Sequence, residues 1–395
     1  MLQNILWKKG LVMYDFDKLI TRENTNCAKW DTVEEGLLPM WVADMDFQSP
    51  PEVIAALQER VRHGVYGYSG GYGGWFEALI QWMKKRHGWA PQRDWISTSP
   101  GVVAALYMLV RALTEPGDRI IIQPPVYRPF FNVARSHGCE LLENPLCFDG
   151  RKYHMDLERL RQQVDTRVKL LILCSPHNPV GRVWSQEELV ALGQFCLEHE
   201  IIIISDEIHS DLVFPGYKHT VLASISKELE QNTVVCNAPS KTFNIPGIQA
   251  SNVVIANENL RSIYRRALRN SGLALPSVFA VTAVEAAYTY GEPWLEELLL
   301  YLQDNYRLVT SFLAEYIPEI KVVEPEGTYL LWLDCRSLGL NDKELDRFIK
   351  EKAQLLLEPG PVFGTGGSGF QRMNIACPRQ RLMTALQRLK KAVRG

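Results

Sequence analysis

Residues 201–209 read Ile-Ile-Ile-Ile-Ser-Asp-Glu-Ile-His, a short β-branched apolar run that ends in acidic side chains. Four other runs have a similar character, at 119–123, 168–174, 233–237 and 251–256. Each is too short for a typical helix and is apolar at successive positions rather than at alternate ones. This pattern is typical of strands that are buried on both faces of a parallel sheet.

Segments with a helical period lie between these runs. Residues 185–199, for example, begin with a capping box from Ser185 to Glu188 and carry apolar side chains on one face. The alternation of strands and helices predicts an α/β fold over roughly residues 60–290.

The two ends of the chain have a different pattern. Residues 1–55 and 291–395 contain longer amphipathic segments, such as 293–316, and an apolar stretch at 328–334 that suits a strand. We therefore expect a small α+β domain that is assembled from both chain ends. The predicted division is 1–55 as the N-terminal part of the small domain, 56–290 as the large domain, and 291–395 as the C-terminal small domain.

Composition excludes several classes of function. The chain of 395 residues has 43 basic and 45 acidic side chains, a net charge of −2, so we expect no nucleic acid and no anionic membrane as partner. The longest apolar stretch, 101–113, is interrupted by Arg111 and is far shorter than the roughly 20 residues of a membrane helix. Residues 1–9 contain no run that resembles a signal peptide.

The eight cysteines are scattered, and no two form a Cys-x-x-Cys pair. This spacing favours neither a zinc site nor a disulfide framework. We expect buried reduced thiols in a cytoplasmic protein, and we predict no metal site.

Polar and aromatic residues follow four of the apolar runs. In open α/β sheets, ligands bind outside the carboxyl ends of the strands. Tyr127 follows the run at 119–123, and Asn178, Asp206 and Lys241 follow the next three runs along the chain. The sequence thus predicts an aromatic ring, an amide, a carboxylate and a lysine at one edge of the sheet.

A glycine-containing turn, Ser99-Pro-Gly-Val-Val, precedes a predicted helix whose first N–H groups could hold a phosphate. These parts together suit a flat, phosphorylated heterocyclic aldehyde, because the lysine can bind it covalently and the carboxylate can pair with its ring nitrogen. Pyridoxal phosphate meets these requirements. Taken singly, Asp206 could be a helix cap, Asn178 part of a turn and Tyr127 a packing residue. Their joint order favours the cofactor site.

The chain resembles, over nearly its whole length, the fold-type I pyridoxal-phosphate enzymes of the aspartate aminotransferase superfamily. Within this superfamily it is most similar to the carbon–sulfur β-lyases of the MalY/PatB group. The resemblance implies a seven-stranded, mostly parallel sheet flanked by helices, plus a small α+β domain. The stretches that carry it are Trp41-Val-Ala-Asp-Met-Asp-Phe, Tyr66-Gly-Tyr-Ser, 174–184, Ser205-Asp-Glu-Ile-His-Ser-Asp, 239–247 and 369–379.

The resemblance also implies roles for the residues around the cofactor ring. Lys241 would hold the cofactor covalently and then move the proton of the substrate Cα. Asp206 would keep the pyridine nitrogen protonated. Asn178 would donate a hydrogen bond to the 3′-oxygen of the ring, and Tyr127 would stack on the ring near the substrate.

For the phosphate, the resemblance implies backbone N–H groups at Gly101, Val102 and Val103 and the hydroxyl of Ser240. Tyr68 would reach the phosphate of the neighbouring subunit and take part in catalysis there. The active unit would therefore be a homodimer with its active sites at the subunit interface.

Arg372 would bind the substrate α-carboxylate in a two-pronged pair. Asp44 would lie near the substrate side chain. Two positions depart from the common aminotransferase pattern: His209 stands among the cofactor residues where many aminotransferases have tyrosine, and Gln249 stands where they have a phosphate-binding arginine. Both departures agree with the lyase group.

The implied reaction is an α,β-elimination on L-cystathionine or another S-substituted cysteine, which yields a thiol, pyruvate and ammonia. An aminotransferase with the same cofactor remains the alternative, and a cofactor-bearing regulatory protein that acts by protein contact is a remote one. The glycine loop at 364–369 is either a mobile lid or an exposed turn.

Overall fold

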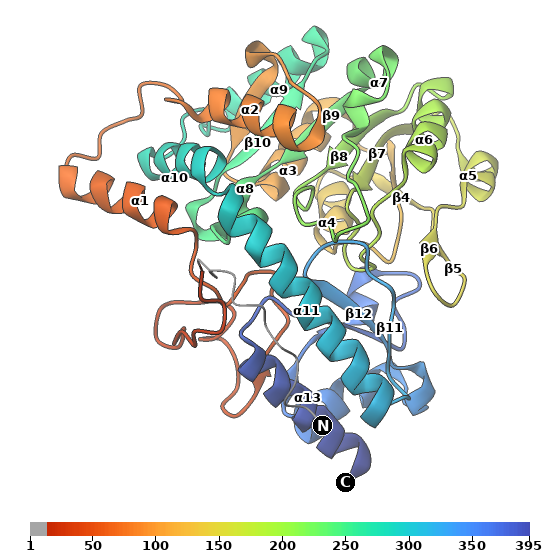
Figure 1. The fold of residues 1–395 in the computed structure, drawn as a ribbon. Coiled ribbons are helices and arrows are strands. Elements are labelled where there is room, and N and C mark those ends of the chain that lie inside the picture. The colour runs from red at the N-terminus through yellow and green to blue at the C-terminus, as the bar shows by residue number, and fades with distance from the viewer. Residues whose placement is uncertain (1–13) are drawn as a thin grey trace.

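A central seven-stranded sheet organises the chain in the computed structural model, which describes residues 14–395. Strand β10 runs antiparallel to both of its neighbours, and the remaining pairs are parallel (Figure 1). The predicted fold class is thereby confirmed. The strand order is β2 (Ile96–Ser99), β10 (Ser251–Ile255), β9 (Thr233–Asn237), β8 (Ile202–Asp206), β7 (Val168–Cys174), β3 (Arg119–Ile122) and β4 (Glu140–Glu143).

Two apolar cores cover the two faces of this sheet. One core joins the strands to α3 (Val102–Leu113), α4 (Pro129–Arg135) and α9 (Glu258–Asn270). The other joins them to α5 (Leu157–Gln163), α6 (Gln186–Glu198) and α7 (Lys227–Asn232). Burial on both faces explains why the strand sequences are apolar at successive positions.

A second, four-stranded antiparallel sheet lies below the first in Figure 1. The long helix α11 (Glu292–Tyr316) runs from the first sheet toward the second (Figure 1). The strand order is β11 (Lys321–Val322), β12 (Leu330–Asp334), β15 (Phe370–Asn374) and β14 (Glu358–Pro359), with α12 (Asp342–Arg347), a π-helical turn (Phe348–Lys352) and α13 (Arg379–Arg394) beside it.

The two ends of the chain meet at a short parallel pair, β1 (Leu38–Pro39) with β13 (Leu355–Leu356). The predicted domain limits at 55 and 290 stay a prediction, and the predicted absence of a signal-like run at 1–9 lies outside the described residues. No helix of the described residues is long and apolar enough to cross a membrane. The remaining elements are α1 (Pro51–His63), α2 (Trp75–His87), β5 (Cys147–Phe148), β6 (Tyr153–His154), α8 (Pro239–Thr242) and α10 (Val278–Tyr290).

The N-terminus of α6 contains the capping box that the sequence predicts. Ser185 Oγ accepts a hydrogen bond from the N–H of Glu188, and the Glu188 carboxylate accepts one from the N–H of Ser185, so the predicted capping box is present. We expect Ser185→Ala to lower the free energy of unfolding by about 1 kcal/mol, because the Glu188 N–H loses its acceptor. Denaturant unfolding checks this, with Ser185→Thr as the control that keeps the cap. Equal stability of all three proteins would contradict it.

Candidate active site

A cavity of about 180 Å³ opens at the carboxyl ends of β3, β7, β8 and β9. Nine of the twelve predicted site residues line it, and the other three, Tyr68, Arg372 and Asp44, do not. These nine residues therefore lie together, as expected from the rule that ligands of open α/β sheets bind at the carboxyl ends of the strands. The nine are Gly101, Val102, Val103, Tyr127, Asn178, Asp206, His209, Ser240 and Lys241, and Ala43, Cys174, Ile208 and Gln249 are among the other lining residues.

Lys241 lies in the short helix α8, which follows directly on β9. Its Nζ donates a hydrogen bond to the carbonyl of Ala43, at 2.6 Å. Burial lowers the pKa of Lys241 to about 8, and the positive charge of Arg372 acts in the same direction. The amine is therefore partly neutral near physiological pH, as a nucleophile or base requires.

Asp206 is the last residue of β8, and its side chain faces the cavity from a buried position. Burial raises the pKa of Asp206 to about 7, and the negative charge of Glu207 adds to the rise. The N–H of Ile208 donates to its Oδ1, at 3.2 Å. No basic side chain of residues 14–395 forms an ion pair with this carboxylate, so the site leaves room for a cation such as a protonated ring nitrogen.

Tyr127, Asn178 and His209 line the same cavity from three different strand ends. Burial raises the pKa of Tyr127 to about 12 and lowers that of His209 to about 3, so both side chains are neutral. The Nδ1 atom of His209 is buried and finds no hydrogen-bond partner within the described part of the chain. A ligand that fills the cavity would complete this donor set.

The N-terminus of α3 faces the same space. The first hydrogen bond at this end runs from the N–H of Ala105 to the carbonyl of Gly101, so the N–H groups of Val102 and Val103 have no partner within the helix. Such a helix end favours an anion. Gln249, a neutral side chain, lines the same cavity, so an anion held there would depend more on the helix end than it would beside an arginine.

Arg372 is buried on β15 and is held just outside this cavity. Its Nη1 donates to Oδ1 of Asn178, at 3.0 Å, and its Nη2 donates to the carbonyl of Trp41, at 2.7 Å. The Nε atom is buried and has no partner among the residues described. Arg372 thus retains a donor for a substrate carboxylate while two contacts fix its position.

Asp44 occupies a different environment from the one expected. Its carboxylate binds Arg22 at 2.6 Å (Oδ2–Nη2), and Lys29 lies 3.4 Å from its Oδ1. These ion pairs direct the side chain into a charged cluster, and direct contact with substrate stays a prediction that the ion pairs weigh against. The neighbouring backbone does reach the site, because the carbonyl of Ala43 accepts hydrogen bonds from Lys241 and from the hydroxyl of Tyr329.

Tyr68 does not reach the cavity of its own chain. Its side chain is 97% exposed, and it lies at a separate cleft of about 540 Å³ between residues 66–69 and 272–279. The predicted role of Tyr68 toward a neighbouring subunit stays a prediction.

The glycine loop at 364–369 packs closely rather than standing free. A Cβ built on Gly367 would lie 2.0 Å from the carbonyl oxygen of Gly360, and one on Gly364 would lie 2.4 Å from the ring of Phe131. The hydroxyl of Thr365 donates to the Glu143 carboxylate. Between the mobile lid and the exposed turn that the sequence left open, these contacts favour the turn, in which Thr365, Gly366 and Ser368 are exposed.

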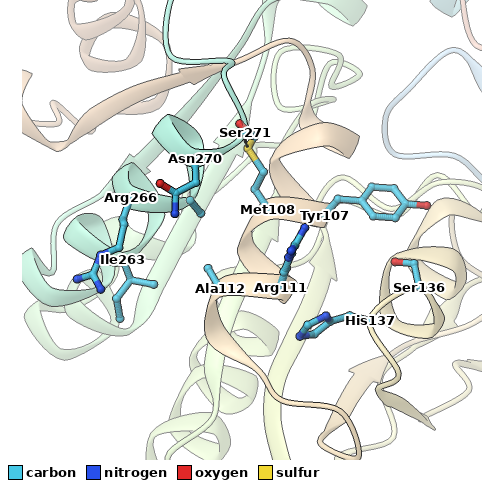
Figure 2. A pocket seen from close by; sticks show the side chains of 11 residues that line it. Tyr107, Met108, Arg111, Ala112, Ser136, His137, Ile263, Arg266, Asn270 and Ser271 are labelled. Carbon is cyan, nitrogen blue, oxygen red and sulfur yellow. Dashed lines mark hydrogen bonds between the residues drawn. The ribbon is translucent and has the colours of Figure 1, made fainter.

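A larger cleft, of about 660 Å³, lies between α3, α9 and the turn after α4 (Figure 2). Arg111, His137 and Arg266 are among its lining residues. None of the twelve predicted residues lies in it. Because it holds no carboxylate–lysine pair, it is not the candidate active site.

Fold and site together define a protein that binds a phosphorylated heterocyclic aldehyde on an α/β scaffold. The model of the aminotransferase class I and II family matches residues 37–389, and the chain belongs to this family.

Individual proteins are similar to the chain over nearly its whole length. The chain is 45% identical over 385 residues to cystathionine β-lyase PatB of Bacillus subtilis, covering 96% of this chain and all of PatB. It is similar in structure to a provisionally assigned, PLP-bound aminotransferase of Clostridium difficile 630, with a TM-score of 0.94 and 44% identity over 96% of this chain and 100% of the other. It is also similar to cystalysin of Treponema denticola, which contains pyridoxal 5′-phosphate, with a TM-score of 0.93 and 39% identity over 97% and 99%.

The raised pKa of Asp206 predicts a pH-dependent stability of the cofactor-free chain. Below pH 4 the carboxyl is protonated in both the folded and the unfolded state. The pKa of this carboxyl is about 3.9 in the unfolded chain and about 7 in the folded chain, and folding becomes progressively less favourable as the pH rises from the first value to the second. Above pH 7 the full cost of keeping the buried carboxyl ionised remains. Asp206→Asn should therefore stabilise the cofactor-free protein at pH 8, by up to about 4 kcal/mol, and should have little effect near pH 4.

Thermal unfolding midpoints of the two proteins between pH 4 and pH 8 measure this difference. Glu351→Gln, at an exposed carboxylate, is the matched control and should shift the midpoint little at either pH. An Asp206→Asn protein that is less stable than wild type at pH 8 would show that the carboxylate has a favourable partner, contrary to the account above.

Proposed function

We propose that the chain is a pyridoxal-phosphate-dependent carbon–sulfur β-lyase that acts on L-cystathionine or related S-substituted cysteines. One observation carries the proposal: a buried carboxylate that forms no ion pair within the described residues and a buried lysine of lowered pKa, Asp206 and Lys241, line one cavity. The identity of 45% with a cystathionine β-lyase, over the whole length of that enzyme, gives the reaction class.

The residues present fit pyridoxal phosphate. Asp206 supplies the negative charge for a protonated pyridine nitrogen, and the end of α3 supplies N–H groups for the phosphate. The orphaned Nδ1 of His209 offers a further hydrogen-bonding group. When bound, the cofactor supplies an electrophilic carbon for amino groups and an electron sink for negative charge at the substrate Cα.

Lys241 performs the proton transfer in this proposal. Because burial lowers its pKa to about 8, a fraction of the amine is neutral at pH 7 to 8 and can accept the Cα proton. The Ala43 carbonyl holds Nζ in one position between transfers. Arg372 binds the substrate α-carboxylate and thereby orients the Cα–H bond toward the amine.

The overall reaction breaks the Cβ–S bond and consumes one water: an S-substituted cysteine gives a thiol, pyruvate and ammonium. The Cα proton leaves to Lys241, and the thiolate leaves Cβ with the bonding electron pair. Tyr127, whose pKa is about 12, stays protonated and packs as a neutral ring beside the reacting atoms.

We infer a homodimer in which Tyr68 of one subunit completes the site of the other. Tyr68, Tyr66, Val65 and Leu275 are exposed together around the cleft at residues 66–69 and 272–279, although apolar side chains gain by burial. A second copy of the chain would cover them. We also infer a cytoplasmic location, because all eight cysteines are free thiols.

An aminotransferase is the second candidate, and the similarity to the assigned aminotransferase of Clostridium difficile 630 favours it. The two activities differ in their need for an acceptor. A lyase releases pyruvate from cystathionine alone, whereas an aminotransferase needs a 2-oxo acid. Pyruvate formation that depends strictly on an added 2-oxo acid would favour the aminotransferase.

Lys241→Ala should abolish pyruvate release from cystathionine, because no other amine lines the cavity among the described residues. We expect a loss of at least 10³-fold in kcat, since both the covalent anchor and the base are removed. The measurement is pyruvate formation under saturating cofactor, with Lys152→Ala, which does not line the cavity, as control. Retained activity in Lys241→Ala would refute the assignment.

Mixed dimers test the role of Tyr68. We expect both Tyr68→Ala and Lys241→Ala to be weakly active or inactive when pure. After subunit exchange at equal amounts, heterodimers would carry one intact site, and activity should return to about a quarter of wild type. No recovery, in a preparation that is shown to contain heterodimers, would place Tyr68 in the site of its own chain.

A further inference from the structure

Glu358 lies beside the residue to which the substrate carboxylate is assigned. It stands opposite Arg372 in the pairing of β14 with β15. Its Oε2 atom lies 3.7 Å from Nη2 of Arg372, and its side chain is 20% exposed. This distance is too long for a hydrogen bond, so the two groups are charge neighbours rather than bonded partners.

Arg372 has other partners for its terminal nitrogens, namely Oδ1 of Asn178 and the carbonyl of Trp41. The Glu358 carboxylate, by contrast, accepts no hydrogen bond from any residue that the structure describes. Its lone pairs are therefore not used by a donor within the described residues. Burial raises the pKa of Glu358, and the charges of Arg372 and Arg128 oppose this rise.

The charges around Arg372 do not balance when a simple substrate binds. An α-carboxylate on Arg372 places two negative groups, its own and that of Glu358, beside one buried guanidinium. Arg128 is exposed, and solvent screens its charge. A substrate that brings a cation on its sulfur substituent restores the balance and provides a donor for Glu358.

We propose that Glu358 determines substrate specificity by accepting a hydrogen bond from a cationic group on the sulfur substituent. The preferred class is S-(aminoalkyl)cysteines, in which a distal ammonium accompanies the thioether. Cystathionine also offers an ammonium at its far end as a donor for Glu358, although a carboxylate accompanies this ammonium and leaves the substituent without net charge. The inference rests on the proposed lyase function and narrows its substrate.

The test compares two thioethers of nearly equal size with the holoenzyme. S-(2-aminoethyl)-L-cysteine and S-propyl-L-cysteine differ in a terminal ammonium against a methyl group. We expect wild type to prefer the ammonium compound in kcat/KM by about tenfold or more, the effect of one charge-assisted hydrogen bond. Glu358→Gln should lose this preference because kcat/KM falls for the ammonium compound, while kcat/KM for the S-propyl compound stays equal to or above the wild-type value.

Glu351→Gln is the matched control, because it removes the same charge from an exposed position in the turn Phe348–Lys352. It should retain the wild-type preference. Glu358→Asp, which keeps the charge on a shorter stem, should retain part of it. A wild-type enzyme without any preference for the ammonium compound would overturn the proposal, whatever the variants do.

Two results with Glu358→Gln would also overturn it. An equal gain in affinity for both compounds would make Glu358 only a counter-ion of Arg372. An equal loss for both, with a changed absorption spectrum of the bound cofactor, would make it a structural residue.

A binding experiment separates this proposal from the lyase function. L-ornithine and L-norvaline differ in a terminal ammonium, and neither carries a thioether. Titration of each into the holoenzyme, followed by the absorbance of the bound cofactor, should give a preference for ornithine that Glu358→Gln removes. If neither thioether releases pyruvate while this preference is present, the lyase function fails and the role of Glu358 stands. If pyruvate is released without the preference, the role of Glu358 fails alone.

Discussion

The buried carboxylate of Asp206 is the constraint on which the rest of the site depends. A carboxylate without a cation is costly in a protein interior, and here burial raises its pKa to about 7. A parallel strand places it there, because β8 ends at the edge where ligands of open α/β sheets bind. The N–H of Ile208 and the charge of Lys241 offset part of this cost, and a cation that enters the cavity would offset more of it, which favours a ring that carries one.

Buried polar networks behind the cavity keep this arrangement rigid. The Glu207 carboxylate bonds to Nε2 of His219, at 2.9 Å, and accepts from the hydroxyl of Ser205. A few residues on, Asp211 bonds to Nε2 of His87 and to the hydroxyl of Thr242, both at 2.8 Å. Thr242 directly follows Lys241, so Asp211 ties the short lysine-bearing helix to α2. Satisfied networks of this kind fix side-chain positions more firmly than apolar packing alone.

The sequence predicts the strands and the residues that follow them with good accuracy. The apolar runs at 168–174 and 233–237 coincide with β7 and β9, because burial on both faces leaves a local pattern. Four functional side chains follow from the rule that ligands bind at strand ends. The antiparallel direction of β10 leaves no such pattern, since it depends on pairing across the sheet.

Contacts between segments that lie far apart in the chain cannot be predicted from the sequence alone. The carbonyl of Ala43 holds Lys241, 198 residues away, and a backbone carbonyl carries no residue-type signal. The contact of Asp44 with substrate stays a prediction; its carboxylate pairs with Arg22 and Lys29, and nothing in the motif at 41–47 indicates these partners. The position of Glu358 opposite Arg372 likewise depends on the register of β14 on β15, which the sequence alone does not show.

The most direct test of the central claim is the protonation state of the bound cofactor ring. The measurement is the ¹⁵N chemical shift of the pyridine nitrogen in holoenzyme prepared with labelled pyridoxal phosphate. We expect a protonated nitrogen in the wild type up to about pH 8, and loss of that proton in Asp206→Asn, since a nearby carboxylate favours the cationic form. An unprotonated nitrogen in the wild type at neutral pH would contradict the pairing with Asp206, and with it the account of the site.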